Sequence, residues 1–308
     1  MIRSILHRLL WAALTVWAVA TASFFLVRAA PGDPFLTEIR SLRPEVREAR
    51  MREYGLDRPL AEQYGRWLWG IASRGDLGPS MKYRGKTVGG IIAQTLPASL
   101  ALGSIAMVFA LVLGLSTGIL AALHQGRLLD NLLMAAAVLG ISLPSFVIAM
   151  LLIVLFVFAV PLFPLAGWDG YRQVVLPAFA LSLPFVARIS RLARAGMLDV
   201  LSEDWILTAR AKGLRESQVV VRHALRGALL PVVSYLGPAF AMILTGSLVI
   251  EKIFFIPGLG KIFIQAALNR DYYVVLGTVV VFSSLLCLFN FLVDLSYAIL
   301  DPRVRQSP

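Results

Sequence analysis

Two long stretches without any charged residue, Leu96–Leu123 and Asn131–Trp168, constrain the fold of this chain more than any other feature of its sequence. A membrane span needs about 20 consecutive apolar residues, whereas a water-soluble core interleaves apolar residues with polar ones. The composition points the same way, because 58% of the 308 residues are hydrophobic and 15% are charged. Soluble domains average about 45–50% apolar and about 25% charged residues. We therefore expect an all-α integral membrane protein.

At about 20 apolar residues per crossing, the sequence predicts six transmembrane helices. Their expected ranges are Leu9–Val27, Leu96–Leu123, Leu132–Val160, Val174–Ala195, Ala228–Ile250 and Tyr272–Ala298. The fourth has the shortest uncharged stretch, and its helix would continue through Arg188, Arg191 and Arg194, whose long side chains can reach the headgroups.

Two further patterns indicate how the spans are shaped and packed. Proline removes a backbone donor and tends to kink a membrane helix. Five prolines lie in or near the spans, at Pro144, Pro177, Pro184, Pro231 and Pro238. Gly114 and Gly118 form a GxxxG pattern, which permits two helix backbones to approach closely.

The basic residues are distributed as in a multi-pass protein with both termini in the cytoplasm. Short cytoplasmic loops are enriched in lysine and arginine. Arg3 and Arg8 precede the first span, and Arg303 and Arg305 follow the last. Eight basic residues also fall between Arg188 and Arg226. The net charge of +11 is therefore assigned to membrane topology rather than to nucleic-acid binding.

The predicted organisation has three parts. Residues 1–28 form an N-terminal transmembrane helix, and Arg28 at the possible cleavage site favours an uncleaved helix over a signal peptide. Residues 29–95 form an external subdomain, with helix-forming stretches at Pro44–Tyr54 and Leu60–Ile71. Residues 96–308 form the transmembrane core.

Patterns for catalysis are missing from the sequence. The nearest approach to a phosphate-binding GxxxxGK[ST] loop is Gly85-Lys86-Thr87, which has Ser80 where the first glycine is required. Cys287 is the single cysteine, which excludes a disulfide within the chain. Zinc ligands must cluster, and the histidines stand in separate segments, at His7, His124 and His223. We expect no enzyme activity, no metal site and no cofactor in this chain.

Two polar residues, Asn290 and Asp294, lie one helical turn apart in the last predicted span. A carboxylate at the centre of a bilayer costs about 2.5–3.5 kcal/mol by insertion scales, so Asp294 should face protein or water. A structural partner is the favoured interpretation. A proton relay is the alternative and would suit a proton-coupled carrier.

The segment 199–227, called the elbow below, is predicted to form a helix, a glycine break and a second helix. Ser202 can cap the first helix, and Gly213 can take the left-handed conformation that ends it. The consequence is a pair of short cytoplasmic helices that meet at a sharp angle.

Two interpretations of the elbow stay open on residue spacing alone. In the first, Val219, Val220 and Val221 anchor in a groove of another protein while Arg215 and Arg222 pair with its charges. In the second, the arginines bind lipid headgroups.

The elbow resembles the EAA loop, the helix-glycine-helix hallmark of the membrane subunits of type I ABC importers. Ala209, Gly213 and Leu225 match that pattern, whereas Leu207 replaces its glutamate and Arg226 its proline. The resemblance assigns coupling to the ATPase to Thr208, Ala209, Arg210, Ala211, Lys212, Gly213, Leu214, Arg215, Arg222, His223 and Leu225.

Further motifs extend the resemblance over nearly the whole chain. They are Ala30-Pro31-Gly32-Asp33-Pro34, Tyr54-Gly55-Leu56-Asp57, Gly75-Asp76-Leu77-Gly78-Pro79-Ser80, Gly246-Ser247-Leu248-Val249-Ile250-Glu251, Pro257-Gly258-Leu259-Gly260, Asn269-Arg270-Asp271-Tyr272 and Leu300-Asp301-Pro302-Arg303. Together they look like the B-type membrane subunits of oligopeptide permeases, in the peptide and nickel branch of these importers.

This resemblance implies the type I importer permease fold and a place in the bacterial inner membrane. It also implies a homologous C-type permease subunit, two ABC ATPases that hold ATP and Mg, and an external substrate-binding protein that delivers peptide. Residues expected to contact that binding protein are Asp33, Tyr54, Asp76, Glu251, Arg270 and Asp271. Import of nickel or another small solute, a proton-coupled carrier, and a scaffold or receptor are the alternatives.

Overall fold

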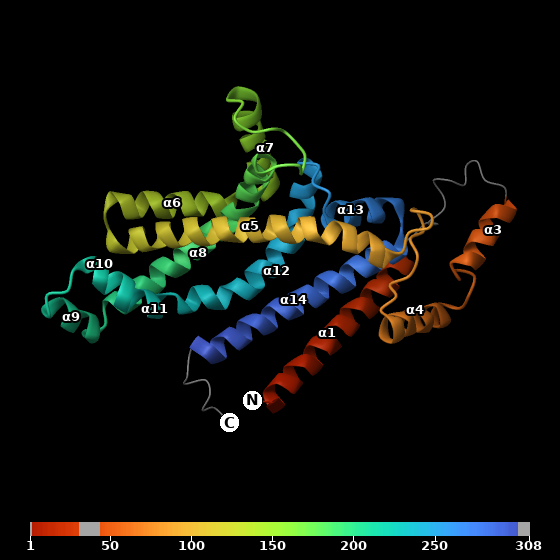
Figure 1. Cartoon of the computed structure of the whole chain (residues 1–308), viewed down its shortest axis with the longest axis horizontal. Coiled ribbons are helices and arrows are strands. Elements are labelled where there is room, and N and C mark those ends of the chain that lie inside the picture. The colour runs from red at the N-terminus through yellow and green to blue at the C-terminus, as the bar shows by residue number, and fades with distance from the viewer. Residues whose placement is uncertain (1, 31–43, 301–308) are drawn as a thin grey trace. The chain divides into compact units, whose positions relative to one another are not determined.

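The computed structural model describes residues 2–30 and 44–300, and most of them lie in helices (Figure 1). One isolated antiparallel bridge joins Pro79 and Thr87. The chain divides into two compact units, Met1–Ser99 with Pro257–Cys287 and Leu100–Ile256 with Leu288–Pro308. The expected all-α class is confirmed. Two long helices, α5 (Val88–Leu123) and α14 (Tyr272–Leu300), contribute residues to both units.

In the first unit, α1 (Ile2–Ala29) lies beside the first part of α14 (Figure 1). Ala20 and Phe24 of α1 pack with Leu276 of α14 in one buried cluster. Farther along the same pair, the half-buried Cys287 places its sulfur 3.8 Å from the backbone oxygen of Ala12. Few residues of α1 are buried, and its exposed apolar side chains suit a lipid environment.

Two helices expected between the first and second spans are confirmed, as α3 (Pro44–Glu53) and α4 (Leu60–Arg74). One face of α4 is apolar, and its Tyr64, Trp67 and Ile71 pack around Phe24. The helix ends at Gly75, whose left-handed backbone (φ 64°) lets its N–H reach back to the carbonyls of the last turn.

Also in the first unit, the short helix α13 (Leu259–Asn269) begins where the side chain of Ser99 accepts a hydrogen bond from the backbone N–H of Leu259 at 2.8 Å. The first N–H groups of a helix have no partner within the helix, so this contact satisfies one of them. It also ties α13 to α5, whose buried Val88, Ile91 and Ile92 share a cluster with α13.

In the second unit, α8 (Tyr171–Leu201) packs against α6 (Leu128–Ser142), α7 (Ser145–Ile153), α11 (Leu225–Ala228) and α12 (Leu230–Ile253). It also contacts α5 at the GxxxG pattern. A Cβ atom at Gly114 would lie 2.8 Å from Ile189, and one at Gly118 would collide with the backbone oxygen of Ser190. The expected close helix packing is confirmed.

The helix α8 continues through Arg188, Arg191 and Arg194, as expected from the sequence. Arg194 does not reach for headgroups, because its Nε and Nη2 each donate a 2.7 Å hydrogen bond to the carboxylate of Asp130 in α6. Asp130 is 2% exposed and also accepts a 3.0 Å hydrogen bond from the N–H of Gly126. A buried carboxylate thus holds the arginine in a two-point contact.

The third predicted span, Leu132–Val160, is broken rather than continuous, and the expected kink at Pro144 is confirmed. The chain forms α6 and then α7, which continues into the π-helical turn η1 (Val154–Ala159), and the two parts are bent by 105°. Pro144 is the cause: it clashes with a helical conformation of the preceding residue, and Leu143 is accordingly extended (φ −92°, ψ 130°). Among the described residues, five helices are long and apolar enough to cross a membrane, or six if this bent pair is one span.

Candidate functional site

The elbow begins where α8 ends. Ser202 remains helical (φ −85°, ψ −7°) and donates its hydroxyl to the carbonyl of Asp199 at 2.7 Å, so it closes α8. The predicted cap by Ser202 is therefore wrong, because the extended residue that precedes α9 (Asp204–Ala211) is Glu203. Asp204 in the first turn and Arg210 in the last suit the charges at the two ends of the helix.

The break at Gly213 is confirmed. Its φ of 78° lies in the left-handed region, and its N–H bonds to the carbonyl of Arg210 at 2.9 Å. The chain then enters α10 (Glu216–Gln218), the π-helical turn η2 (Val219–Ala224) and α11. A side chain other than glycine would strain this turn.

An ion pair connects the residues on the two sides of the break at Gly213. Arg210 donates to both carboxylate oxygens of Glu216, through Nη2 at 2.7 Å and Nε at 3.2 Å. This contact raises the pKa of Arg210 and lowers the pKa of Glu216, because each charged form stabilises the other. The two side chains are partly exposed, so the pair orients the two helices more than it stabilises the fold.

The apolar side of the elbow packs on its own chain. Ile206 and Ala209 of α9 join Val219 and Val220 of η2 in a buried cluster with Ala122 and Met197, which end α5 and α8. The interpretation of Val219 and Val220 as anchors in another protein is therefore wrong, since a buried face cannot also fill a partner's groove. Val221, in contrast, is 67% exposed.

Most residues to which the resemblance assigned coupling lie on the outer face of the elbow. Eight are exposed: Thr208, Arg210, Ala211, Lys212, Gly213, Leu214, Arg215 and Arg222. His223 and Leu225 are half-buried, and Ala209 is buried. Trp205, which the sequence did not single out, and Leu207, which replaces the glutamate of the EAA pattern, are both exposed on α9 and add apolar surface to this face.

The residues expected to contact a binding protein fall into two groups. Asp33 lies outside the described residues. Tyr54 is half-buried and donates its hydroxyl to the carbonyl of Ser80 at 3.2 Å, while Asp76 is exposed and Arg270 half-buried. These three remain accessible to another protein.

Two further candidates, Glu251 and Asp271, have no exposed surface. The hydroxyl of Ser247 donates to Glu251 at 2.7 Å within α12. Asp271 accepts hydrogen bonds from the side chain of Ser80 and from the backbone N–H groups of Met81 and Lys82, the latter two at 3.1 and 3.2 Å. Both carboxylates serve contacts within the chain, which corrects their assignment to a docking surface.

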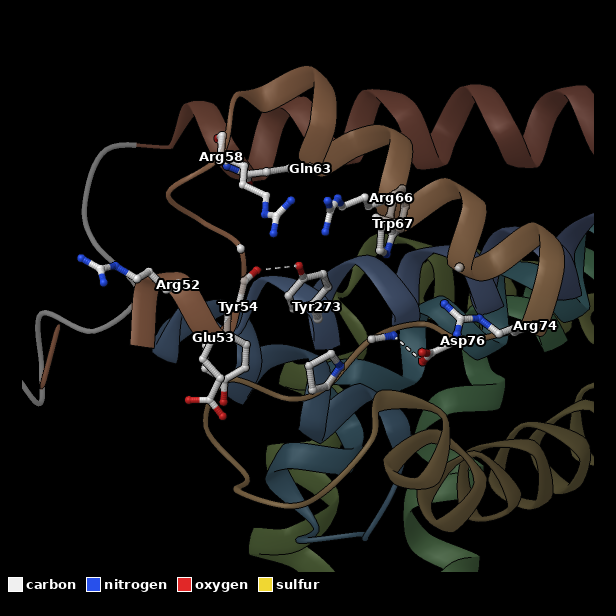
Figure 2. Close-up of a pocket in the computed structure, with 14 residues that line it drawn as sticks. Arg52, Glu53, Tyr54, Arg58, Gln63, Arg66, Trp67, Arg74, Asp76 and Tyr273 are labelled. Carbon is white, nitrogen blue, oxygen red and sulfur yellow. Dashed lines mark hydrogen bonds between the residues drawn. The ribbon is translucent and has the colours of Figure 1, made fainter. Parts of the chain in front are cut away.

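A cavity of about 250 Å³ lies between α3, α4, the turn after α4 and Tyr273 of α14. Figure 2 shows Arg58, Arg66 and Trp67 reaching toward it above Tyr54 and Tyr273. Hydropathy and motif spacing could not find this site, because its walls come from separate segments. The available signal was Arg66 directly beside Trp67 in α4.

Two other expectations concern polar and metal sites. Asn290 lies on α14, where its side-chain oxygen would be 3.1 Å from a Cβ atom at Gly237 of α12. Asp294 falls on the same helix, and its side chain lies outside what the structure describes. Within the described residues, no three of His, Cys, Asp and Glu gather closely enough to hold a metal ion.

The comparisons with known proteins agree over the full length of the chain. A family described as the binding-protein-dependent transport system inner membrane component matches residues 114–306, and its N-terminal counterpart matches residues 1–102. The chain is 45% identical to the oligopeptide transport system permease protein OppB of Haemophilus influenzae over 307 residues, which are 99% of this chain and 100% of that protein.

Two further similarities bear on sequence and fold. The dipeptide transport system permease protein DppB of Bacillus subtilis is 45% identical over 96% of both chains. An inward-facing structure of the MetNI methionine ABC transporter matches 68% of this chain and 96% of its own, with a TM-score of 0.53 and 20% identity. That second match concerns the fold alone. The chain belongs to the family of inner membrane components of binding-protein-dependent transport systems, and it has the fold of an ABC importer permease.

Proposed function

We propose that this chain is the membrane-spanning B-type subunit of an ATP-driven importer of oligopeptides. It provides half of the translocation pathway, and a homologous C-type subunit provides the other half. Two ABC ATPases supply the energy, and a soluble binding protein delivers the peptide. The observation that carries the proposal is the full-length similarity to OppB and DppB proteins, whose names specify oligopeptide and dipeptide transport.

The elbow is the element that transmits the movement of the ATPase to this chain. Its outer face carries exposed basic residues. Its inner face packs through Val219 and Ile206 against the last turns of α5 and α8. A movement imposed on the elbow is therefore passed to two long helices rather than absorbed by a loose loop. The buried inner face supports this role better than headgroup binding, which needs no such connection.

We place both termini and the elbow in the cytoplasm and residues 44–95 outside. The basic residues of the N-terminus and of the segment 188–226 support this orientation. Tyr54, Asp76 and Arg270 then lie on the side where a binding protein arrives.

The experiment that tests the proposed function is uptake of labelled peptide by the complete complex in proteoliposomes. We expect uptake only when ATP is present on the side of the elbow and the ATPases and the binding protein is present on the opposite, external side. Uptake that persists without ATP but follows a proton gradient would support a carrier instead. A complex that binds but never transports peptide would support a receptor.

A further inference from the structure

Three arginines of α8 gather at a cavity of about 470 Å³ in the second unit. Three basic and three apolar residues line it: Arg188, Arg191, Arg194, Met134, Leu192 and Ala195. The arginines follow one another at intervals of three residues, so they lie along one side of the helix. Basic side chains within a membrane span are rare, and they mark the paths of ions and substrates.

Only one of the three arginines has a carboxylate partner among the described residues. Asp130 holds Arg194 at 2.7 Å. Arg188 instead lies over the ring of Tyr235 in α12, 5.9 Å from its centre, a contact that contributes no negative charge. Arg191 is exposed and forms no ion pair within the described part of the chain. Arg188 and Arg191 therefore carry two positive charges that the described residues do not neutralise.

The spacing of Arg188 and Arg191 favours an anion between them. Residues three positions apart on a helix have Cβ atoms about 5–6 Å apart, and like charges at this spacing repel each other. An anion removes the repulsion. Each guanidinium can donate two parallel hydrogen bonds to a carboxylate, whose two oxygens match the planar fork. The pair is therefore suited to a single carboxylate.

The exposure of α8 argues against lipid chains on this face. Among residues 173–198, all of which the structure describes, only Arg188, Arg191 and Ala195 are exposed. In contrast, α1 exposes leucine, tryptophan and phenylalanine side chains along its length, as a lipid-facing helix does. An acyl chain along α8 would meet no large exposed apolar side chain in that described stretch. The exposed face of α8 therefore suits water and a polar ligand.

The two arginines also lie at the depth of the membrane. Arg172 and Arg188 bracket the 15 uncharged residues 173–187, which measure about 22 Å as a helix. The hydrocarbon core is about 30 Å thick. With Arg172 at one boundary of the core, Arg188 falls about 6 Å short of the other, and a tilted helix leaves it deeper still. A guanidinium at that depth is costly in lipid and is expected to face water or protein.

We propose that Arg188 and Arg191 bind the carboxylate of a peptide as it crosses the membrane. The two guanidinium groups donate to the carboxylate oxygens, and Met134 and Leu192 contact the adjoining apolar part of the peptide. Every unmodified peptide ends in a carboxylate, and a charge of this kind needs a partner within an apolar layer. The proposal rests on the proposed function, because it makes the cavity part of the path that the peptide takes.

The test compares two peptides that differ in one charge, in proteoliposomes with the complete complex, ATP and the wild-type binding protein. Tri-alanine ends in a carboxylate, whereas its C-terminal amide is neutral at that end. We expect the double variant Arg188→Gln/Arg191→Gln to slow uptake of the acid about tenfold, because charge-assisted hydrogen bonds are lost. Uptake of the amide should stay within about twofold. The binding protein is the same throughout, so its own preference cancels between the two permeases.

Two further variants make the comparison specific. Arg191→Lys keeps the charge without the planar fork, and it should retain more uptake of the acid than Arg191→Gln. The matched control is Arg127→Gln, the same charge change at an exposed arginine of the same unit that does not line the cavity. Both peptides should stay within about twofold of wild type there, because exposed charges at a distance are screened. If the double variant does not assemble, Arg191→Gln alone decides, since Arg191 is exposed.

A third peptide, the C-terminal amide of Ala-Glu-Ala, distinguishes the source of the carboxylate. Slower uptake of this peptide by the double variant would support a site for any peptide carboxylate. Unchanged uptake, together with slower uptake of tri-alanine, would support a site for the C-terminal carboxylate alone.

Equal slowing of tri-alanine and its amide would overturn the proposal, since the arginines would then serve assembly or movement of the complex. Unchanged uptake of tri-alanine by the double variant would also overturn it. Loss of the C-type subunit or of bound anionic phospholipid, with an unchanged ratio of acid to amide uptake, would identify a partner chain or a headgroup as the occupant instead. Failure of the proposed function is distinguishable, because the wild-type complex would then take up neither peptide with ATP.

Discussion

The carboxylate of Asp271 accepts a hydrogen bond from the hydroxyl of Ser80, although the two residues are 191 positions apart in the sequence. Asp271 also accepts from the N–H groups of Met81 and Lys82 and, at 3.4 Å, from that of Val274 in the first turn of α14. One buried side chain thus joins the turn before α5 to the start of α14.

Asp271→Asn should destabilise the protein, because an amide cannot accept the same set of hydrogen bonds and places a donor against backbone N–H groups. Loss of a hydrogen bond to a buried charged group costs about 1.5–3 kcal/mol. Thermal unfolding of the purified protein in detergent measures the effect. Asp57→Asn is the control, since Asp57 is exposed. Equal melting temperatures for the two variants would contradict the structural role of Asp271.

Gly118→Ala should weaken the packing of α5 on α8. The added methyl group meets the backbone oxygen of Ser190, and overpacking of this kind costs about 1–3 kcal/mol. Gly89→Ala, in the same helix with open space around it, should be neutral or stabilising. The measurement is the thermal stability of the two variants in detergent. A Gly118→Ala variant as stable as Gly89→Ala would mean that α5 and α8 can move apart at no cost in free energy.

The ion pair between Arg210 and Glu216 predicts a pH dependence at low pH only. Because Arg210 lowers the pKa of Glu216, the pair contributes stability at every pH above the usual carboxyl pKa, about 4.3. That contribution is lost as the pH falls through the lowered pKa. The melting temperature of Glu216→Gln should therefore lie slightly below wild type from pH 6 to 8, by less than about 1 kcal/mol of stability for an exposed pair. The difference should vanish in acid, and a difference that changes between pH 6 and 8 would point to another group.

Gly213→Val and Arg222→Glu should uncouple ATP hydrolysis from transport while the protein remains in the membrane. The first strains the left-handed turn, and the second reverses an exposed charge on the outer face of the elbow. Peptide uptake and ATPase activity are measured together in proteoliposomes. Arg172→Glu, at an exposed arginine far from the elbow in sequence, is the control. Normal transport by both elbow variants would refute the coupling role.

Topology can be tested with single cysteines in a Cys287→Ser background. Ser73 and Ser217 are both exposed, which makes them suitable positions for labelling, whereas Ser80 is buried. An impermeant thiol reagent applied to intact cells should label Ser73→Cys and not Ser217→Cys. The opposite result would invert the proposed orientation.

Several features of the fold were predictable because they depend on short stretches of sequence. Apolar runs locate the spans, since the bilayer is a solvent that acts on each segment in turn. Left-handed Gly213 and the helices α3 and α4 follow from local conformational preferences. The GxxxG pattern in α5 predicted a close contact with another helix, but it did not indicate that this helix is α8.

The tertiary structure decided what each chemically distinctive side chain does. Glu251 and Asp271 look like surface charges in sequence but are buried, and Val219 and Val220 look like anchors for a partner but fill the core beneath the elbow. The sequence indicated a kink at Pro144, but it did not indicate that the third span bends there by as much as 105° into two helices.

The sequence by itself therefore determined the class of protein, its membrane segments and, through its motifs, its family. Only the tertiary structure brought Arg66 and Trp67 to one cavity with Tyr273, and Ser80 to Asp271. The physical reason is the range of the forces involved. Partition into a bilayer and helix formation are set within one or a few turns, whereas burial and hydrogen bonding depend on which distant segments pack together.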